Sequence, residues 1–239
     1  MNEIYYYFLL FLIYSFIGWL IEVIGKLIEK HKFINRGFLI GPICPIYGHG
    51  CLLMILTLSR YKDNPLTLFI CAIFICSLLE YFTSYFMEKI FKARWWDYST
   101  KRFNLNGRIC AETMIPFGIL GTLVICVINP IFEYLLNLFN FETIKIVAII
   151  LFVIYLIDNI ISLTIMFGFK GTLKTVEKDG TEEITKKVKK ILINKNVLYK
   201  RLVEAFPNFM NPKERLLLIK AKVEKELKNI EKKIKNNLK

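Results

Sequence analysis

The sequence has no phosphate-binding loop of the form GxxxxGKS or GxxxxGKT, so the chain cannot itself be an ATPase. It also lacks the nucleophile and metal motifs GxSxG and HExxH. We therefore expect no enzymatic activity, and an enzyme that acts on lipid is the one enzymatic alternative left open. The six cysteines form no CxxC pair, and His31 and His49 are the only histidines. We expect neither a metal site nor a cofactor.

Charged residues are almost missing from five long stretches within the first 170 residues. A bilayer core about 30 Å thick requires roughly 20 helical residues to cross it, so each stretch is long enough to span a membrane. Hydrophobic residues make up 55% of the chain and its mean hydropathy is +0.44, which is high for a soluble domain. The sequence predicts an all-α polytopic membrane helix bundle of about five transmembrane helices. The stretches are Ile4–Ile21, Gly37–Ser59, Pro65–Met87, Thr113–Phe132 and Ile146–Phe169.

The second stretch begins in an unusual way for a membrane helix. Gly41, Pro42, Pro45, Gly48 and Gly50 each weaken or interrupt helical hydrogen bonding. Irregular backbone is tolerated at membrane depth only where it is buried in protein or lines a wet cavity. Two interpretations stay open: residues 42–50 form a re-entrant segment, or a loop precedes a helix that begins near Pro45.

Basic residues are distributed unevenly between the expected loops. The loops after the first and third helices carry four and six Lys or Arg residues, whereas those after the second and fourth carry two and none. Lys and Arg favour the cytoplasmic side of short loops. We therefore expect the N-terminus outside the cell, and the first loop, the third loop and the C-terminus in the cytoplasm.

Ionisable residues inside the expected helices fall at a similar depth. Glu22, His49, Glu80, Glu112 and Asp158 lie in the middle or the cytoplasmic half of the bundle. Residues three or four positions apart share a helix face, so serine and glycine neighbours place the acids on small or polar seams. Intramembrane charges are costly and usually face inward. We predict that these residues bind a cation, a proton or a cationic headgroup, with Glu80 and Asp158 as the main candidates.

A structural alternative applies to the acids near the cytoplasmic boundary. Each can pair with a nearby basic residue and so need no ligand. For Glu80 and Asp158, no basic side chain lies at matching depth except that of His49, which favours a functional role. The pairs expected under the structural alternative are Glu22 with Arg36, Glu112 with Arg108, and Glu88 with Lys92.

The loop after the third helix is expected to be ordered against the cytoplasmic end of the bundle. Trp95 and Trp96 are of the type that anchors at lipid headgroups. Asp97 can cap a following turn or accept from an arginine, and Asn106-Gly107 favours a tight turn. Such a loop either closes the mouth of the acidic layer or serves as an interfacial anchor.

Several segments carry a family resemblance when they are taken together: Phe16–Glu22, Asn35–Leu39 with Gly41–Gly48, Leu79–Tyr81, Trp95–Ser99 and Phe103–Ile109. They resemble the bacterial CmpB-like family, whose members are labelled ABC transporter permeases. Trp95–Ser99, with Glu112 and Pro116 downstream, also resembles a small family of animal multi-pass membrane proteins.

The resemblance covers residues 4–170. It implies a permease-like transport component in the bacterial cytoplasmic membrane, served by a separate ATPase subunit. The alternative is a non-transporting membrane scaffold whose tail recruits or oligomerises partners.

Residues 171–239 are predicted to form a separate basic region. From Lys170 onward there are 20 Lys or Arg and 9 Asp or Glu residues. Asn211-Pro212 is typical of a helix start, and apolar residues recur at steps of three and four over 212–238. We expect a cytoplasmic amphipathic helical tail, in a hairpin or short coiled coil, that binds a partner, a second copy or anionic lipid. Nucleic acid is not expected, because no recognition motif accompanies the charge.

Overall fold

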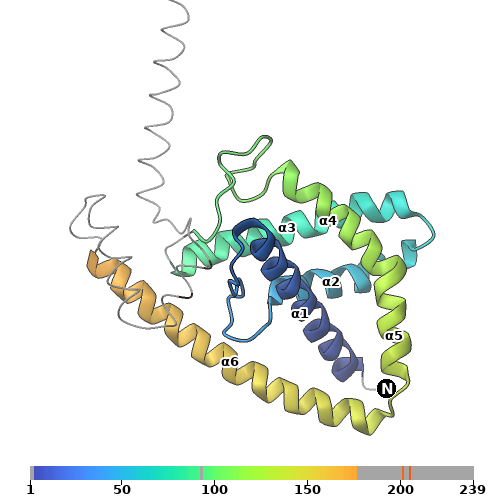
Figure 1. The fold of residues 1–239 in the computed structure, drawn as a ribbon. Helices are drawn as coiled ribbons and strands as arrows, with labels where there is room; N and C mark the ends of the chain where they lie inside the picture. Colours follow the sequence, from blue (N-terminus) through green and yellow to red (C-terminus); the bar gives the residue numbers. More distant parts are fainter. Residues whose placement is uncertain (1–2, 92–93, 177–200, 202–204, 206–239) are drawn as a thin grey trace, which may run out of the picture.

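The computed structural model describes residues 3–91, 94–176, 201 and 205, and within these ranges it is helical, with no strand (Figure 1). The all-α prediction is confirmed. The expected helix over residues 212–238 lies outside the described residues. The elements are α1 (Glu3–Lys30), α2 (Pro45–Leu58), η1 (Ser59–Tyr61), α3 (Pro65–Phe91), α4 (Ala111–Leu123), the π-helical η2 (Val124–Ile128), α5 (Asn129–Asn137) and α6 (Phe141–Val176).

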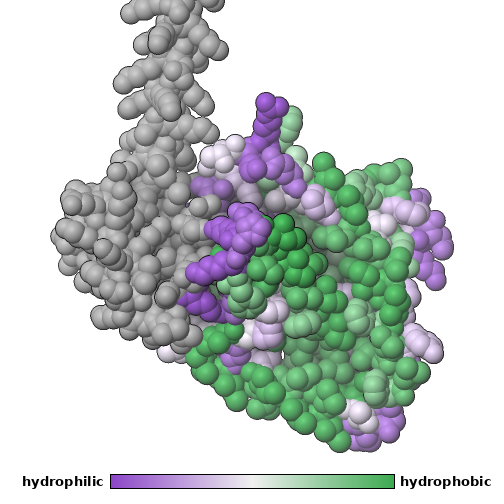
Figure 2. Space-filling view, in the orientation of Figure 1, coloured by the Kyte–Doolittle hydropathy of each residue, from purple (hydrophilic) through white to green (hydrophobic). Residues whose placement is uncertain are grey.

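Four helical stretches are long and apolar enough to cross a membrane. They are Glu3–Lys30, Pro65–Phe91, Ala111–Asn137 and Phe141–Phe167. Large hydrophobic side chains are exposed along all of them, and Figure 2 shows a broad hydrophobic surface with hydrophilic residues mostly at its margins. An apolar surface of this extent is suited to lipid rather than to water. The chain is a multi-pass membrane protein.

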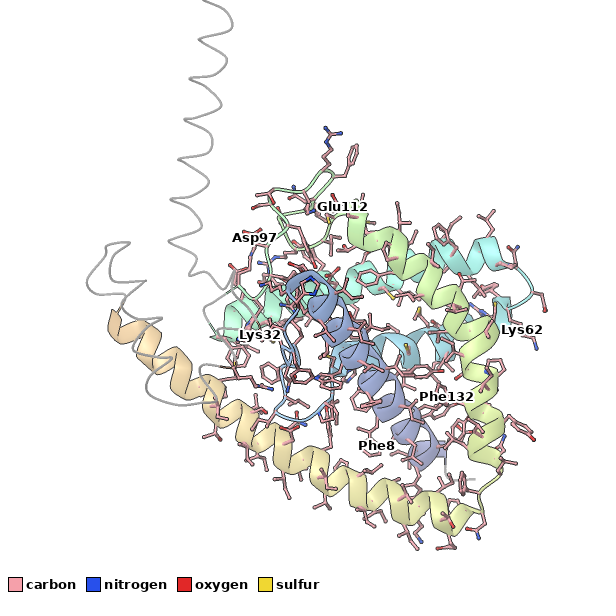
Figure 3. All side chains as sticks on the ribbon, viewed as in Figure 1. Phe8, Lys32, Lys62, Asp97, Glu112 and Phe132 are labelled. Atoms are coloured by element: carbon pink, nitrogen blue, oxygen red, sulfur yellow. The ribbon has the colours of Figure 1, made fainter. Side chains whose placement is uncertain are left out.

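The expectation of a fifth full-length helix is wrong. α2 has only 14 residues, because Gly41 and Pro42 precede it in a non-helical segment and the helix begins at Pro45. Lys32 and Lys62, which flank this part of the chain, nevertheless lie at opposite ends of the bundle (Figure 3). The connection between these two ends of the bundle is therefore shared between non-helical backbone at residues 31–44 and the short helix α2.

Small residues bring α1 and α2 into close contact. A Cβ atom added at Gly18 would lie 2.1 Å from the Tyr47 ring, and one added at Gly48 would lie 2.2 Å from the Ser15 hydroxyl. Within a bilayer there is little hydrophobic drive between helices, so close packing at such small residues is what holds them together. These contacts fix the first turn of α2 against the middle of α1.

The remaining helices enclose this pair. Gly121 of α4 packs on Ala72 of α3, where an added Cβ would lie 2.5 Å from the Ala72 methyl. The start of α6 packs on α1 through Leu9, Ile144 and Ala148. The result is a bundle in which α2 contacts both α1 and α3 and leads toward Lys62, away from the end that carries Lys32, Asp97 and Glu112 (Figure 3).

Candidate functional site between α1, α2 and α3

Glu80 is a buried acid in the middle of α3, with 7% of its surface exposed. Ser77 and Ser84, on the same face of the helix, are buried as well, so the predicted polar seam does face the interior. One carboxylate oxygen, Oε1, accepts a hydrogen bond of 3.2 Å from the Tyr98 hydroxyl. The other, Oε2, is buried and accepts no hydrogen bond within the described part of the chain. The Thr113 hydroxyl lies close to the Glu80 carboxylate and donates to the Cys110 carbonyl at 2.9 Å.

Glu22 approaches Glu80 from α1 but has a different set of partners. Its Oε2 accepts from Arg36 Nε at 3.2 Å, and its Oε1 accepts from the Tyr47 hydroxyl at 2.7 Å. The expected pairing with Arg36 is confirmed. Glu22 and Glu80 are close enough for their charges to interact. Arg36 pairs with Glu22, so among the residues that the structure describes the cluster carries one negative charge in excess when both acids are ionised.

Tyr98 covers the side of this cluster that faces the loop between α3 and α4. It belongs to the loop between α3 and α4, and its hydroxyl donates to Glu80. Burial, together with the neighbouring Glu80 carboxylate, raises the pKa of Tyr98 well above its usual value. Tyr98 therefore remains a protonated donor throughout the physiological pH range.

The loop that carries Tyr98 is ordered against the bundle, as expected. Asp97 Oδ1 accepts from the Ser99 backbone N–H at 2.9 Å and lies 3.5 Å from Arg94 Nη1, so Asp97 makes both of the contacts that were expected as alternatives. Asn106 and Gly107 have φ values of 54° and 65°, and the Arg108 N–H donates to the Leu105 carbonyl. Positive φ at both central positions is the pattern of a type I′ turn.

A buried ion-pair network anchors the same loop. Glu88 Oε2 accepts from Arg94 Nη2 at 2.9 Å and lies 2.7 Å from Arg108 Nη2. The expected pairing of Arg108 with Glu112 is wrong, because Arg108 turns inward to Glu88 and Ser84. Glu112 is exposed and pairs with Lys101 at 2.7 Å.

The expected partner of Glu88, Lys92, lies outside the described residues. Trp95 is also placed differently from the expectation. It is 3% exposed and packs against Ile34, Phe91 and Met166 inside the protein, rather than standing at the lipid headgroups.

Asp158 on α6 is engaged by main-chain groups of the non-helical segment. Its Oδ1 accepts from the Ile40 N–H and its Oδ2 from the Gly41 N–H, both at 2.9 Å, and the Ser162 hydroxyl donates to Oδ1 at 3.0 Å. These N–H groups have no helical carbonyl to bind. Asp158 therefore supplies the acceptors that this non-helical segment lacks, and the structure does not bring it to Glu80 as part of one binding site.

His49 is not a partner of the two central acids. Its Nδ1 contacts the Pro45 carbonyl at 2.7 Å, and its ring packs edge-on against Phe11 with centroids 4.8 Å apart. The side chain is exposed at the surface of the bundle. Of the five candidate residues, only Glu22 and Glu80 are therefore gathered into one cluster.

Sequence reasoning did not identify Tyr47 and Tyr98 as members of the cluster. Both hydroxyls come from irregular or short elements, where helical spacing gives no register. Their signal was present but indirect, since each lies in a segment that carries the family resemblance.

Comparison with known protein families matches residues 9–163 to a family described as "Putative ABC-transporter type IV", also designated ABC_trans_CmpB. The match covers well over half of the chain. The chain belongs to this family. No curated protein and no solved structure matches the chain.

Every residue of the acidic cluster in this member of the ABC-transporter type IV family lies inside the matched region. The same holds for Asp158 and the segment that it binds. The family thus supports a transport-related membrane protein, and the matched region contains both sets of buried polar contacts.

Proposed function

We propose that the chain is a permease-like transport component that binds a proton, a cation or a cationic headgroup at Glu80, from a cytoplasmic opening. The observation that carries this proposal is the buried Oε2 atom of Glu80, which accepts no hydrogen bond from the part of the chain that the structure describes. A buried carboxylate without a full set of donors is costly. A proton or a cation bound at Oε2 would remove that cost.

The charges around Glu80 favour a positive ligand. Glu22 and Arg36 offset one another at 3.2 Å, whereas the donor to Glu80 is the neutral Tyr98 hydroxyl. The nearby Tyr47 hydroxyl is also neutral and is directed at Glu22. The excess negative charge therefore rests on Glu80. A single positive charge matches it, and an anion would be repelled.

We assign Asp158 a holding role instead of the ligand-binding role expected for it. Its two oxygens already accept three hydrogen bonds, so it has less need of a cation than Glu80 has. His49 and Glu112 are likewise left out of the proposed site, because one faces Phe11 and the other pairs with Lys101 at the surface.

We further propose the orientation that the loop charges favour, in a bacterial cytoplasmic membrane. The N-terminus would be outside, and the end of the bundle that carries Lys32, Asp97 and Glu112 would face the cytoplasm, where an ATPase subunit could reach it (Figure 3). Cysteines introduced at positions 32 and 62 would test this in intact cells. Membrane-impermeant reagent should label position 62 and not position 32, and the reverse would overturn the orientation.

Infrared difference spectroscopy of the purified protein tests the site without knowledge of the substrate. Spectra would be compared between two pH values, and with and without tetramethylammonium chloride. We expect a carboxyl band that changes in the wild type, is lost in Glu80→Gln, and is retained in Glu112→Gln, which removes an exposed acid by the same substitution. Identical spectra for the wild type and Glu80→Gln would refute the proposal and favour the scaffold alternative.

A further inference from the structure

Three consecutive main-chain carbonyl groups of the non-helical segment point toward one cation. Arg201 Nη1 donates to the Leu39 carbonyl at 2.6 Å and to the Ile40 carbonyl at 3.4 Å, and its Nη2 donates to the Phe38 carbonyl at 3.2 Å. Leu39 is fully buried. All three carbonyls lie outside any helix. The Ile40 carbonyl also accepts from Asn35 Nδ2 at 2.9 Å, whereas without Arg201 the Phe38 and Leu39 carbonyls would lose donors that a membrane interior does not provide.

On the opposite side of the same backbone segment, the N–H groups face the negatively charged Asp158. The N–H groups of Ile40 and Gly41 donate to the Asp158 carboxylate, while the carbonyls of residues 38–40 accept from the Arg201 guanidinium. The two charges interact electrostatically. Peptide dipoles aligned between a carboxylate and a guanidinium favour a positive group at the carbonyl end.

The contact between Arg201 and the bundle is reinforced at a second point. Arg36 Nη1 donates to the Ala205 carbonyl, and Ala205 is fully buried against Ile34 and Trp95. Arg36 is also the partner of Glu22 in the acidic cluster. The residues that hold Arg201 and Ala205 therefore lie beside the cytoplasmic side of the proposed transport site.

We infer that the carbonyls of Phe38, Leu39 and Ile40 form a binding site for a guanidinium group, and that Arg201 of the chain's own C-terminal region occupies it. Planar N–H donors fit three carbonyl acceptors, whereas a cation without N–H groups could satisfy only their charge. Removal of the Arg201 side chain would open the site to a guanidinium group from another molecule.

Cys44 provides a reporter for the occupied and open states. It is 7% exposed, its backbone N–H donates to the Ser15 carbonyl at 2.9 Å, and its side chain interacts electrostatically with Arg201 and Glu22. The labelling rate of Cys44 by a small cationic methanethiosulfonate would be followed by mass spectrometry on the full-length protein in nanodiscs. We expect Arg201→Ala to raise that rate about tenfold or more, as the loss of charged hydrogen bonds implies.

Added ligand then tests the chemistry of the site. Methylguanidinium chloride should slow the labelling of Cys44 in Arg201→Ala, and tetramethylammonium chloride at the same concentration should not. Arg201→Lys, which keeps the charge with fewer donors, should give an intermediate rate. Arg215→Ala, another arginine of the C-terminal region, should behave like the wild type.

Two results would overturn the inference. Equal Cys44 labelling in the wild type, Arg201→Lys and Arg201→Ala would show that Arg201 covers nothing. Equal effects of the two added cations would show that no guanidinium site exists. The inference does not depend on a ligand at Glu80, and Glu80→Gln should leave the protection of Cys44 unchanged.

Discussion

Glu88 is the residue whose replacement should destabilise the bundle most clearly through charge alone. Its Oε2 atom contacts two guanidinium groups, and the side chains of Arg94 and Arg108 are only 2% and 10% exposed. Glu88→Gln preserves the size of the side chain but leaves two buried positive charges without their shared carboxylate. Breaking one side of a buried ion pair costs about 3–5 kcal/mol.

The lower end of that range is the better expectation here, because other groups partly satisfy both arginines. Arg94 also donates to the Asn106 carbonyl at 2.8 Å, and Arg108 donates to Ser84 at 3.1 Å and lies over the rings of Tyr81 and Tyr85. We therefore expect a loss of about 3 kcal/mol in the free energy of unfolding.

Unfolding by sodium dodecyl sulfate in mixed micelles would measure this loss, with Glu112→Gln as the matched control. Glu112 also pairs with a basic residue, but its side chain is 58% exposed. Exposed ion pairs are screened by solvent and contribute little to stability. The control should therefore have the same free energy of unfolding as the wild type. Equal losses in the two variants would refute the argument that burial sets the importance of the Glu88 network.

Two further predictions concern packing and the loop. Gly48→Ala should destabilise the bundle by about 1–3 kcal/mol, since the new methyl would meet α1, whereas Gly25→Ala, with open space around it, should gain up to about 1 kcal/mol in helix propensity. Thermal melting in detergent separates them, and similar melting temperatures would show that α1 and α2 can move apart. Asp97→Ala should lower stability by about 1–2 kcal/mol, because it removes a turn cap and a contact of a buried arginine. Lys101→Ala should melt like the wild type, and an equal loss for the two would show that the loop is only a tether.

The membrane class and most helices could be predicted because they follow from one-dimensional properties. Long uncharged stretches can be recognised without any knowledge of their neighbours in space. The inward seam of α3 was predictable for a related reason: Ser77, Glu80 and Ser84 share a face by helical spacing alone. Even the start of α2 at Pro45 was one of the two interpretations that proline chemistry allowed.

Contacts between elements were predictable only where geometry left few choices. Glu22 and Arg36 are joined across the short connection after α1, and this pair was anticipated. Arg108 and Glu112 are one turn apart in sequence, but residue 108 precedes α4 and lies in a turn, so helical spacing did not apply to it. Arg108 could instead reach α3, where burial strengthens its pairing with Glu88.

The role of Asp158 shows most clearly what a sequence leaves undetermined in a membrane protein. An acid at membrane depth needs donors, and basic side chains were the donors considered. Backbone N–H groups can also act as donors wherever a helix is interrupted. In the non-helical segment before α2, the N–H groups of Ile40 and Gly41 donate to Asp158. The same interruption releases carbonyls, which Arg201 binds. An interrupted helix within a membrane therefore leaves N–H groups that an acid can bind and carbonyl groups that a base can bind, at one point of the fold. An intramembrane acid without a basic partner is thus a reason to look for an interrupted helix nearby.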